Sequence, residues 1–253
     1  MAQNYICIQK NTLQPTVFNI TQNIIETFLN ILAEKNMAQF THIIFDLDGT
    51  LADPREGIRN SIKYALEKMK KDEFSEDLLE RFIGPSLQWG FSNIFGMNEK
   101  DTDLAVKYFR EYFGEKGLYE NEPYPGIYDL MESLQYAGKK MYIASSKLEK
   151  YVHQILEHFE FEKYITMVKG ADYKGEKSSK IELIYDLMAI RQIDHTKEIV
   201  MVGDTIYDIN GGKHNRISTI AVGYGFGIKE ELLAAEPDYY VESVEELSRI
   251  LNS

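Results

Sequence analysis

The chain alternates between short apolar runs and segments in which apolar residues recur every three or four positions. Short apolar runs between polar residues are typical of buried strands, and the wider spacing is typical of amphipathic helices. From residue 123 onward the two patterns alternate, which predicts an α/β fold with a parallel sheet covered by helices on both faces. The expected strands are residues 43–45, 140–144, 165–168, 198–202, 217–222 and 239–241. The expected helices are residues 126–137, 147–159, 179–191, 206–215, 229–235 and 244–251.

Between the first two of these strands, residues 55–122 show only the helical pattern. The spacing predicts four helices, at residues 55–70, 75–81, 87–95 and 100–116. We therefore expect a small all-helical domain over residues 55–122, inserted into a Rossmann-like core made of residues 37–54 and 123–253. Residues 15–35 also have apolar positions at helical spacing, which predicts a helical extension over residues 1–36. The sequence indicates no function for that extension.

The first strand leads directly into Asp46, Asp48, Gly49 and Thr50. Residues two apart on a strand point the same way, so the two carboxylates can converge just past its end. Carboxylates held that close repel each other unless a proton or a cation lies between them, and a hard cation such as Mg2+ fits. A surface turn would read similarly. A calcium loop of the EF-hand type would need its glycine two residues later.

Three later clusters lie where ligands bind in parallel sheets, outside the carboxyl ends of the strands. Ser145, Ser146 and Lys147 follow one strand, where a hydroxyl could cap a helix or bind an anion. Lys180 begins a helix, a position at which a lysine favours a nearby anion, although many such lysines are simply solvated. Asp204 and Asp208 follow another buried strand, four residues apart and so on one face of a helix. Each cluster alone has an ordinary structural explanation.

Composition narrows the class of protein. The net charge of −12 makes a nucleic-acid polymer an improbable partner, because phosphate backbones need a basic surface. The single cysteine excludes an intramolecular disulfide framework and suits a reducing, cytoplasmic compartment. No apolar run reaches the ~20 residues that a membrane helix needs, and no secretory signal precedes the first strand.

Taken together and in this order, the four clusters resemble the motifs of the haloacid dehalogenase (HAD) superfamily. The resemblance covers roughly residues 40–252, and the helical insertion is similar to that family's small cap. A closer similarity is to the branch of phosphoglycolate phosphatases and bacterial 5′-nucleotidases. It is carried by residues 82–87, Tyr124-Pro125-Gly126, residues 144–147, Ser178-Ser179-Lys180 and Gly223-Tyr224-Gly225. Ser145 departs from the threonine that this branch often has, although either residue supplies a hydroxyl.

The resemblance implies a role for each candidate residue. Asp46 would be the nucleophile that forms an aspartyl-phosphate, and Asp48 the general acid and base. Mg2+ would be held by Asp46, the backbone carbonyl of Asp48 and Asp204, with Asp208 a ligand or a support. Ser145 and Lys180 would bind the transferring phosphoryl oxygens, and Lys180 would keep Asp46 ionised. The further substrate-binding candidates are Gly49, Thr50, Ser146, Lys147 and Arg81.

These roles predict a Mg2+-dependent phosphomonoester hydrolase that acts on a small phosphorylated metabolite, of the phosphoglycolate or nucleoside monophosphate type. A phosphomutase of the β-phosphoglucomutase type keeps both aspartates and is the nearest alternative. A non-catalytic phosphate-binding protein on the same fold and a receiver-type signalling domain are further alternatives. Intact motifs disfavour the former, and the helical insertion disfavours the latter. Substrate choice is expected to lie in the cap, around residues 81–88. We expect a monomer or a homodimer without membrane attachment.

Overall fold

The computed structural model describes residues 40–71, 74–82, 86–172, 179–194 and 198–253. The helical extension predicted over residues 1–36 lies outside these described residues, and so does Ser178. Within the described ranges, no helix is both long and apolar enough to cross a membrane.

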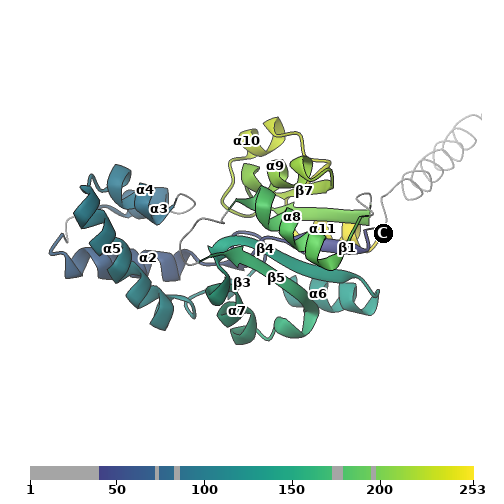
Figure 1. The fold of residues 1–253 in the computed structure, drawn as a ribbon, viewed down its shortest axis with the longest axis horizontal. Helices are drawn as coiled ribbons and strands as arrows, with labels where there is room; N and C mark the ends of the chain where they lie inside the picture. Colours follow the sequence, from purple (N-terminus) through teal and green to yellow (C-terminus); the bar gives the residue numbers. More distant parts are fainter. Residues whose placement is uncertain (1–39, 72–73, 83–85, 173–178, 195–197) are drawn as a thin grey trace, which may run out of the picture. The chain divides into compact units, whose positions relative to one another are not determined.

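One six-stranded sheet forms the centre of the fold (Figure 1). Its strands lie in the order β5-β4-β1-β6-β7-β8, and every neighbouring pair is parallel. The strands are β1 His42–Phe45, β4 Lys140–Leu148, β5 Ile165–Ala171, β6 Ile199–Gly203, β7 Ser218–Val222 and β8 Tyr239–Val241. Each of the five residues of β6 is buried, as expected for a strand covered on both faces. The predicted α/β fold with a parallel sheet is therefore confirmed.

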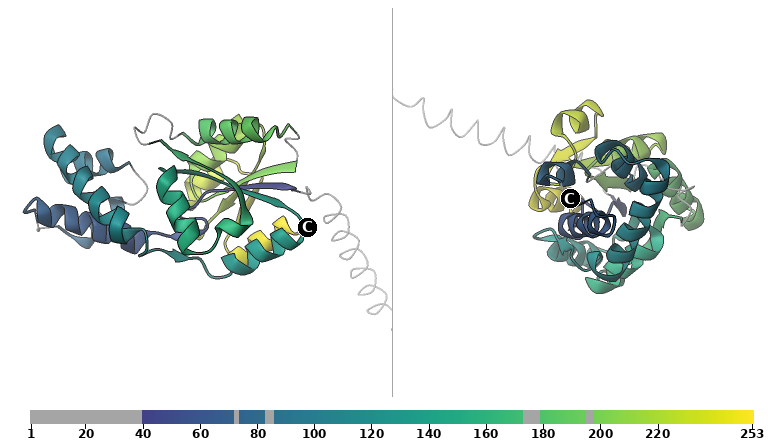
Figure 2. Two further views of the ribbon diagram at one scale, coloured as in Figure 1. Left: turned by 60° about the horizontal axis from the view of Figure 1, so that its bottom comes forward. Right: turned by 90° about the vertical axis from the view of Figure 1, so that its left-hand side faces the viewer.

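Helices cover both faces of this sheet. Figure 2 shows the green helix α8 on one side and the yellow helix α11, beside α6, on the other. The helices are α6 Ile127–Tyr136, α7 Glu149–His158, α8 Lys180–Arg191, α9 Ile206–His214, α10 Lys229–Ala234 and α11 Val244–Leu251, with a 3-10 turn at Glu162–Tyr164. The apolar residues of α8 pack with those of β1, β4 and β6 in a buried cluster that includes Ile44, Leu183 and Met201.

The inserted segment is helical, as the periodicity predicts. It contains α2 Arg55–Lys68, α3 Glu76–Phe82, α4 Leu87–Trp89, η1 Gly90–Ile94, α5 Glu99–Tyr112 and η2 Phe113–Gly117, of which η1 and η2 are π-helical. Its core is aromatic: Phe82 lies against Phe91, Phe95 and Phe109, and the Phe109 ring stacks on Phe113 at 5.4 Å between centroids. We propose, as the sequence predicts, that residues 55–122 form a cap domain of their own.

A short antiparallel ribbon joins this segment to the sheet. β2, Ala52–Asp53, pairs with β3, Glu122–Pro123, so the chain enters and leaves the cap through adjacent strands. The sequence analysis does not anticipate this ribbon, because two-residue strands that pair through backbone groups alone carry no hydrophobic pattern.

The end of β4 differs from the prediction and corrects it. The strand was expected to end at Ala144 and a helix to begin at Lys147. Instead β4 runs on to Leu148, with a shift in its pairing to β5 between Ser145 and Leu148. The strand continues because β5 is long enough to pair with it as far as Ala171. Helix α7 starts at Glu149 without a side-chain cap, so neither serine caps it.

Candidate active site

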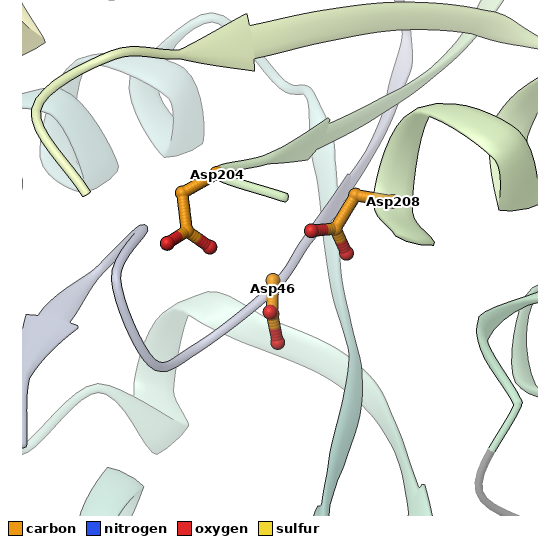
Figure 3. Close-up of side chains that lie close together, drawn as sticks. All are labelled: Asp46, Asp204 and Asp208. Carbon is orange, nitrogen blue, oxygen red and sulfur yellow. The ribbon is translucent and has the colours of Figure 1, made fainter. Parts of the chain in front are cut away.

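Three carboxylates lie at the carboxyl end of the sheet. Asp46 follows β1, Asp204 follows β6, and Asp208 is in the first turn of α9. One carboxylate oxygen from each lies within 4.8 Å of the others. Figure 3 shows the three side chains close together. From β1 the chain continues to β4 and β5 on one side of β1, and it then crosses to β6 on the other side. Ligands bind parallel sheets at such a switch in strand order, at the carboxyl ends of the strands. We call these three residues the acidic triad.

A buried lysine neutralises part of the acidic triad. Lys180 is 5% exposed, and its Nζ lies 2.8 Å from Oδ1 of Asp46 and 2.6 Å from Oδ1 of Asp208. The ammonium also donates to the backbone carbonyl of Ala144 at 2.8 Å. The two carboxylates raise the pKa of Lys180 against the opposing effect of burial, so the side chain stays charged. The lysine predicted at a helix start therefore has its anion, supplied by the protein itself.

The acidic triad remains short of positive charge. Burial raises the pKa of Asp46 to about 6, with Asp208 and Asp48 adding to the rise and Lys180 opposing it. Burial and the neighbouring carboxylates also raise the pKa of Asp204 well above its ordinary value. Buried carboxylates with oxygens this close fit a divalent cation, which would favour their ionised forms. This observation supports the predicted Mg2+ site at Asp46, Asp204 and Asp208.

Neighbouring groups fix the orientation of two carboxylates of the triad. The backbone N–H of Phe226 donates to Oδ2 of Asp204 at 2.8 Å, and the hydroxyl of Thr50 lies 3.5 Å from its Oδ1. The hydroxyl and N–H of Thr205 both donate to Oδ2 of Asp208, at 2.9 and 3.1 Å. Lys180 contacts the other oxygen of Asp208, so both carboxylate oxygens already have partners. Asp208 could therefore contact a cation only through an oxygen that it shares with Lys180 or Thr205. This favours a supporting role for Asp208.

The turn after β1 requires a glycine. Gly49 has φ 77°, and a Cβ there would lie 2.1 Å from Oδ2 of Asp204. Its N–H donates to the carbonyl of Ala52 at 2.9 Å, and the N–H of Thr50 donates to the carbonyl of Leu47. Gly49 thus brings the turn against Asp204. The phosphate contacts predicted for Gly49 and Thr50 stay predictions. To bind phosphate, these two N–H groups would have to give up their present hydrogen bonds to backbone carbonyls.

Asp48 is not a member of the acidic triad and has a partner of its own. Its Oδ2 is 2.8 Å from Nζ of Lys147, and its buried Oδ1 accepts no hydrogen bond from any residue described. The Lys147 side chain is only 7% exposed, and its ammonium lies 4.6 Å from the centre of the Phe113 ring in the cap. The two aspartates of the first motif thus have different partners, Lys180 for Asp46 and Lys147 for Asp48.

The remaining predicted residues differ in their surroundings. Ser145 is buried at the end of β4, and its Oγ accepts the N–H of Lys147 at 3.3 Å. Ser146, the next residue, is exposed. Arg81 is exposed in the last turn of α3, next to residues 83–85, which lie outside the described part. The phosphate contacts of Ser145, Ser146 and Arg81 stay predictions.

Sequence reasoning assigned no role to the residues that support the site. Phe226 and Thr205 orient carboxylates of the acidic triad, and the hydroxyl of Tyr224 donates to the carbonyl of Thr50 at 3.0 Å. Phe113 covers Lys147 from the cap. Of these, only Thr205 had a local signal, a threonine three residues before an acid at a helix start. The other contacts join segments that are distant in the sequence.

Comparisons with known proteins agree with this geometry. A family model described as haloacid dehalogenase-like hydrolase matches residues 43–222. A 5′-nucleotidase of Pseudomonas aeruginosa is 38% identical over 215 residues, which are 85% of this chain and 97% of that protein. Tyrosine-protein kinase PtkA of Mycobacterium tuberculosis is 32% identical over 186 residues, 73% of this chain and 62% of that protein.

A solved structure shares the fold over nearly its whole length. The crystal structure of a predicted phosphatase from Clostridium acetobutylicum matches with a TM-score of 0.75 and 38% identity, covering 83% of this chain and 97% of that one. The resemblance expected from the motifs is thereby confirmed. The chain belongs to the haloacid dehalogenase-like hydrolase family, and within it to the phosphatases.

Proposed function

We propose that the protein is a Mg2+-dependent phosphomonoester hydrolase that works through an aspartyl-phosphate on Asp46. Its substrate is a small phosphorylated metabolite, with nucleoside monophosphates and phosphoglycolate as the first candidates. The observation that carries this proposal is the different setting of the two aspartates. Asp46 lies in the acidic triad against Lys180, while Asp48 pairs with Lys147 and has one oxygen that accepts no hydrogen bond from the residues described. The relationship to a 5′-nucleotidase supports the choice of substrates.

Asp46, Asp204 and the backbone carbonyl of Asp48 are the proposed Mg2+ ligands, with Asp208 in a supporting role. When bound, the cation supplies the positive charge that offsets the repulsion between an anionic carboxylate and a phosphate. Lys180 keeps Asp46 ionised from the other side, since a deprotonated carboxylate is needed for attack.

The reaction then needs two displacements at phosphorus. In the first, a carboxylate oxygen of Asp46 forms a bond to phosphorus, the ester P–O bond breaks, and Asp48 gives its proton to the departing oxygen. In the second, Asp48 takes a proton from water, whose oxygen attacks phosphorus and releases the Asp46 carboxylate and inorganic phosphate. Ser145 and Lys180 are proposed to bind phosphoryl oxygens during both steps.

Transfer to an acceptor other than water is the second candidate. A phosphomutase would pass the phosphoryl group from Asp46 to a sugar hydroxyl. Because one relative is named a tyrosine-protein kinase, a tyrosine hydroxyl is a further acceptor to test. Transfer to either hydroxyl would share the first displacement with hydrolysis and differ only in the group that accepts the phosphoryl.

The test is turnover of p-nitrophenyl phosphate, followed by a panel of nucleoside monophosphates and phosphoglycolate, with and without Mg2+. Hydrolysis predicts one inorganic phosphate for each alcohol released. A shortfall of phosphate would favour transfer to another acceptor. No turnover of any ester by folded protein with Mg2+ would refute the proposed function.

Asp46→Asn should lower kcat by at least about 10^4-fold, because without the nucleophile only the residual catalysis by the other groups of the site remains. The fold should survive, since the amide has nearly the same shape. Asp129→Asn, an exposed position on α6, is the matched control and should keep full activity. Circular dichroism and thermal melting check both variants. Substantial residual turnover in Asp46→Asn would contradict the assignment of the nucleophile.

A further inference from the structure

Lys147 connects the first motif to the cap. Its ammonium is paired with Oδ2 of Asp48 at 2.8 Å on one side and lies 4.6 Å from the centre of the Phe113 ring on the other. With a side chain only 7% exposed, the lysine is largely removed from water. A cation over a desolvated aromatic face is attracted to it, so the ring and the carboxylate hold the ammonium from two directions.

The irregular end of β4 positions Lys147 for these contacts. The pairing with β5 shifts between Ser145 and Leu148, and the N–H of Lys147 donates to Oγ of Ser145. A bulge of this kind re-aims a side chain, and bulges are frequent beside active sites. The strand thus places the lysine beside the turn that carries Asp48.

The cap side of the contact is firmly packed. Phe113 begins η2, stacks on Phe109 within the cap, and meets the Tyr151 ring of α7 edge to face at 5.6 Å. Because both Lys147 and Tyr151 belong to the sheet-containing part of the chain, Phe113 is a direct contact between the cap and the residues around Asp48.

We propose that Lys147 is a positioning residue, which holds Asp48 ready for proton transfer while Phe113 of the cap covers its ammonium. This inference rests on the proposed function. The pair with Oδ2 fixes the carboxyl group and leaves the buried Oδ1, which has no hydrogen-bond partner among the residues described, to carry the proton that passes to the oxygen of the leaving group. Orientation of the acid–base carboxylate is then linked to the position of the cap. A lysine that bound the substrate phosphate instead would affect all esters alike.

The leaving group distinguishes these roles. A phosphate ester of an alkyl alcohol needs a proton on its departing oxygen, whereas p-nitrophenolate departs readily without one. Values of kcat/KM for glycerol 2-phosphate and p-nitrophenyl phosphate report the first displacement for each ester. Their ratio therefore measures acid assistance, and a purely structural loss would leave the ratio unchanged.

The variants are Lys147→Met, which keeps the length and removes the charge, and Lys147→Arg, which keeps the charge. Lys150→Met, an exposed lysine on α7, is the matched control. Lys147→Met should lower the ratio of alkyl to p-nitrophenyl kcat/KM by about 10^2-fold, since positioned proton transfer contributes roughly 10^2–10^4-fold. Lys147→Arg should recover most of the ratio, and Lys150→Met should not change it.

Phe113→Leu tests the link to the cap and does not touch the ion pair. Alone it should lower the same ratio by several-fold. Combined with Lys147→Met it should add no further loss, because the ring acts through the lysine. Additive losses from the two changes would refute the link to the cap.

An unchanged ratio in Lys147→Met would overturn the positioning role, whether both esters lose activity equally, as expected for a phosphate-binding or purely structural residue, or neither loses any. In either case the proposed function would stand. If the wild-type protein with Mg2+ hydrolysed neither ester, both proposals would fail. Phe113→Leu keeps the test decisive if Lys147→Met does not fold, because the positioning role predicts a lower ratio there too.

Discussion

A lysine with almost no exposure to water holds the centre of the site together. Lys180 contacts Asp46 and Asp208, whose side chains are 11% and 0% exposed. Taking such charges out of water costs several kcal/mol for each ion, and only close, well-oriented partners offset that cost. We therefore expect Lys180 to stabilise the fold as well as to serve the proposed chemistry.

Lys180→Met should destabilise the protein by about 3–5 kcal/mol, the usual effect of removing one member of a buried ion pair. It should also abolish turnover. Lys163→Met is the control, because the pair of Lys163 with Glu160 is exposed and should contribute less than about 1 kcal/mol. Urea unfolding measures both variants. A loss below about 1 kcal/mol in Lys180→Met would show that the carboxylates find other compensation.

The predictable residues are those whose position follows from local spacing. Asp46, Asp204 and Asp208 come at strand ends or four residues apart, so a parallel sheet brings them to one edge. Lys147 shows the limit of prediction from local spacing. Its location near the site could be foreseen, but its pairing with Asp48 depends on the shifted end of β4 and on a cap ring, neither of which has a signature in the sequence.

At the scale of elements, the start of α9 ties helix capping to the acidic triad. The hydroxyl and N–H of Thr205 donate to the same oxygen of Asp208, so the residues that begin the helix also orient a carboxylate. Helix α11 begins with a comparable device, in which Oγ of Ser243 accepts the N–H of Glu246 at 3.2 Å.

Thr205→Ala and Ser243→Ala make a matched pair. Each should lower the free energy of unfolding by about 0.5–2 kcal/mol, the common cost of losing a cap. Only Thr205→Ala should also raise the Mg2+ concentration for half-maximal activity, by about 10-fold or more, since groups around the ligands tune affinity for the metal and Thr205 orients Asp208. A similar weakening in Ser243→Ala would mean that instability, not orientation, causes the effect.

Element prediction succeeds where burial leaves a pattern in the sequence. Strands β1, β6 and β8 lie where their apolar runs place them, within one residue at each end. The ribbon of β2 and β3 was missed because its pairing uses backbone groups, and the extension of β4 because Ser145-Ser146-Lys147 is polar. The cap helices were found, while their π-helical ends were not, since one extra residue in a turn does not alter the apolar spacing enough to show.

For the whole molecule, pH and Mg2+ should act on the same carboxylates. Burial raises the pKa of Asp46 from 3.8 to about 6, and that of Asp204 moves in the same direction. A carboxyl group with a raised pKa adds stability below its unfolded value, and that contribution is lost as the pH rises through the folded value. Without metal, these two groups should therefore weaken the fold between about pH 4 and pH 7.

Mg2+ binds the ionised forms, so its stabilising effect should grow over the same interval. We expect a small rise in Tm on adding Mg2+ at about pH 5 and a larger one at about pH 7.5. Mg2+ at about 100 times its Kd would add about 2.7 kcal/mol. Thermal melts with Mg2+ or with EDTA measure the rise in Tm at each pH. Asp204→Asn should remove most of that rise. A rise in Tm that did not depend on pH would contradict the proposed ligands.

The ribbon of β2 and β3 has a consequence for how the sequence of such a protein can evolve. Because β2 and β3 are hydrogen-bonded neighbours, the cap segment starts and finishes at almost the same point. A segment anchored in this way can be replaced by another of different length or sequence while the sheet keeps its register. Chimeras joined at the ribbon should therefore fold, and selection can remodel what surrounds the organic part of a substrate while the phosphate-processing groups stay constant.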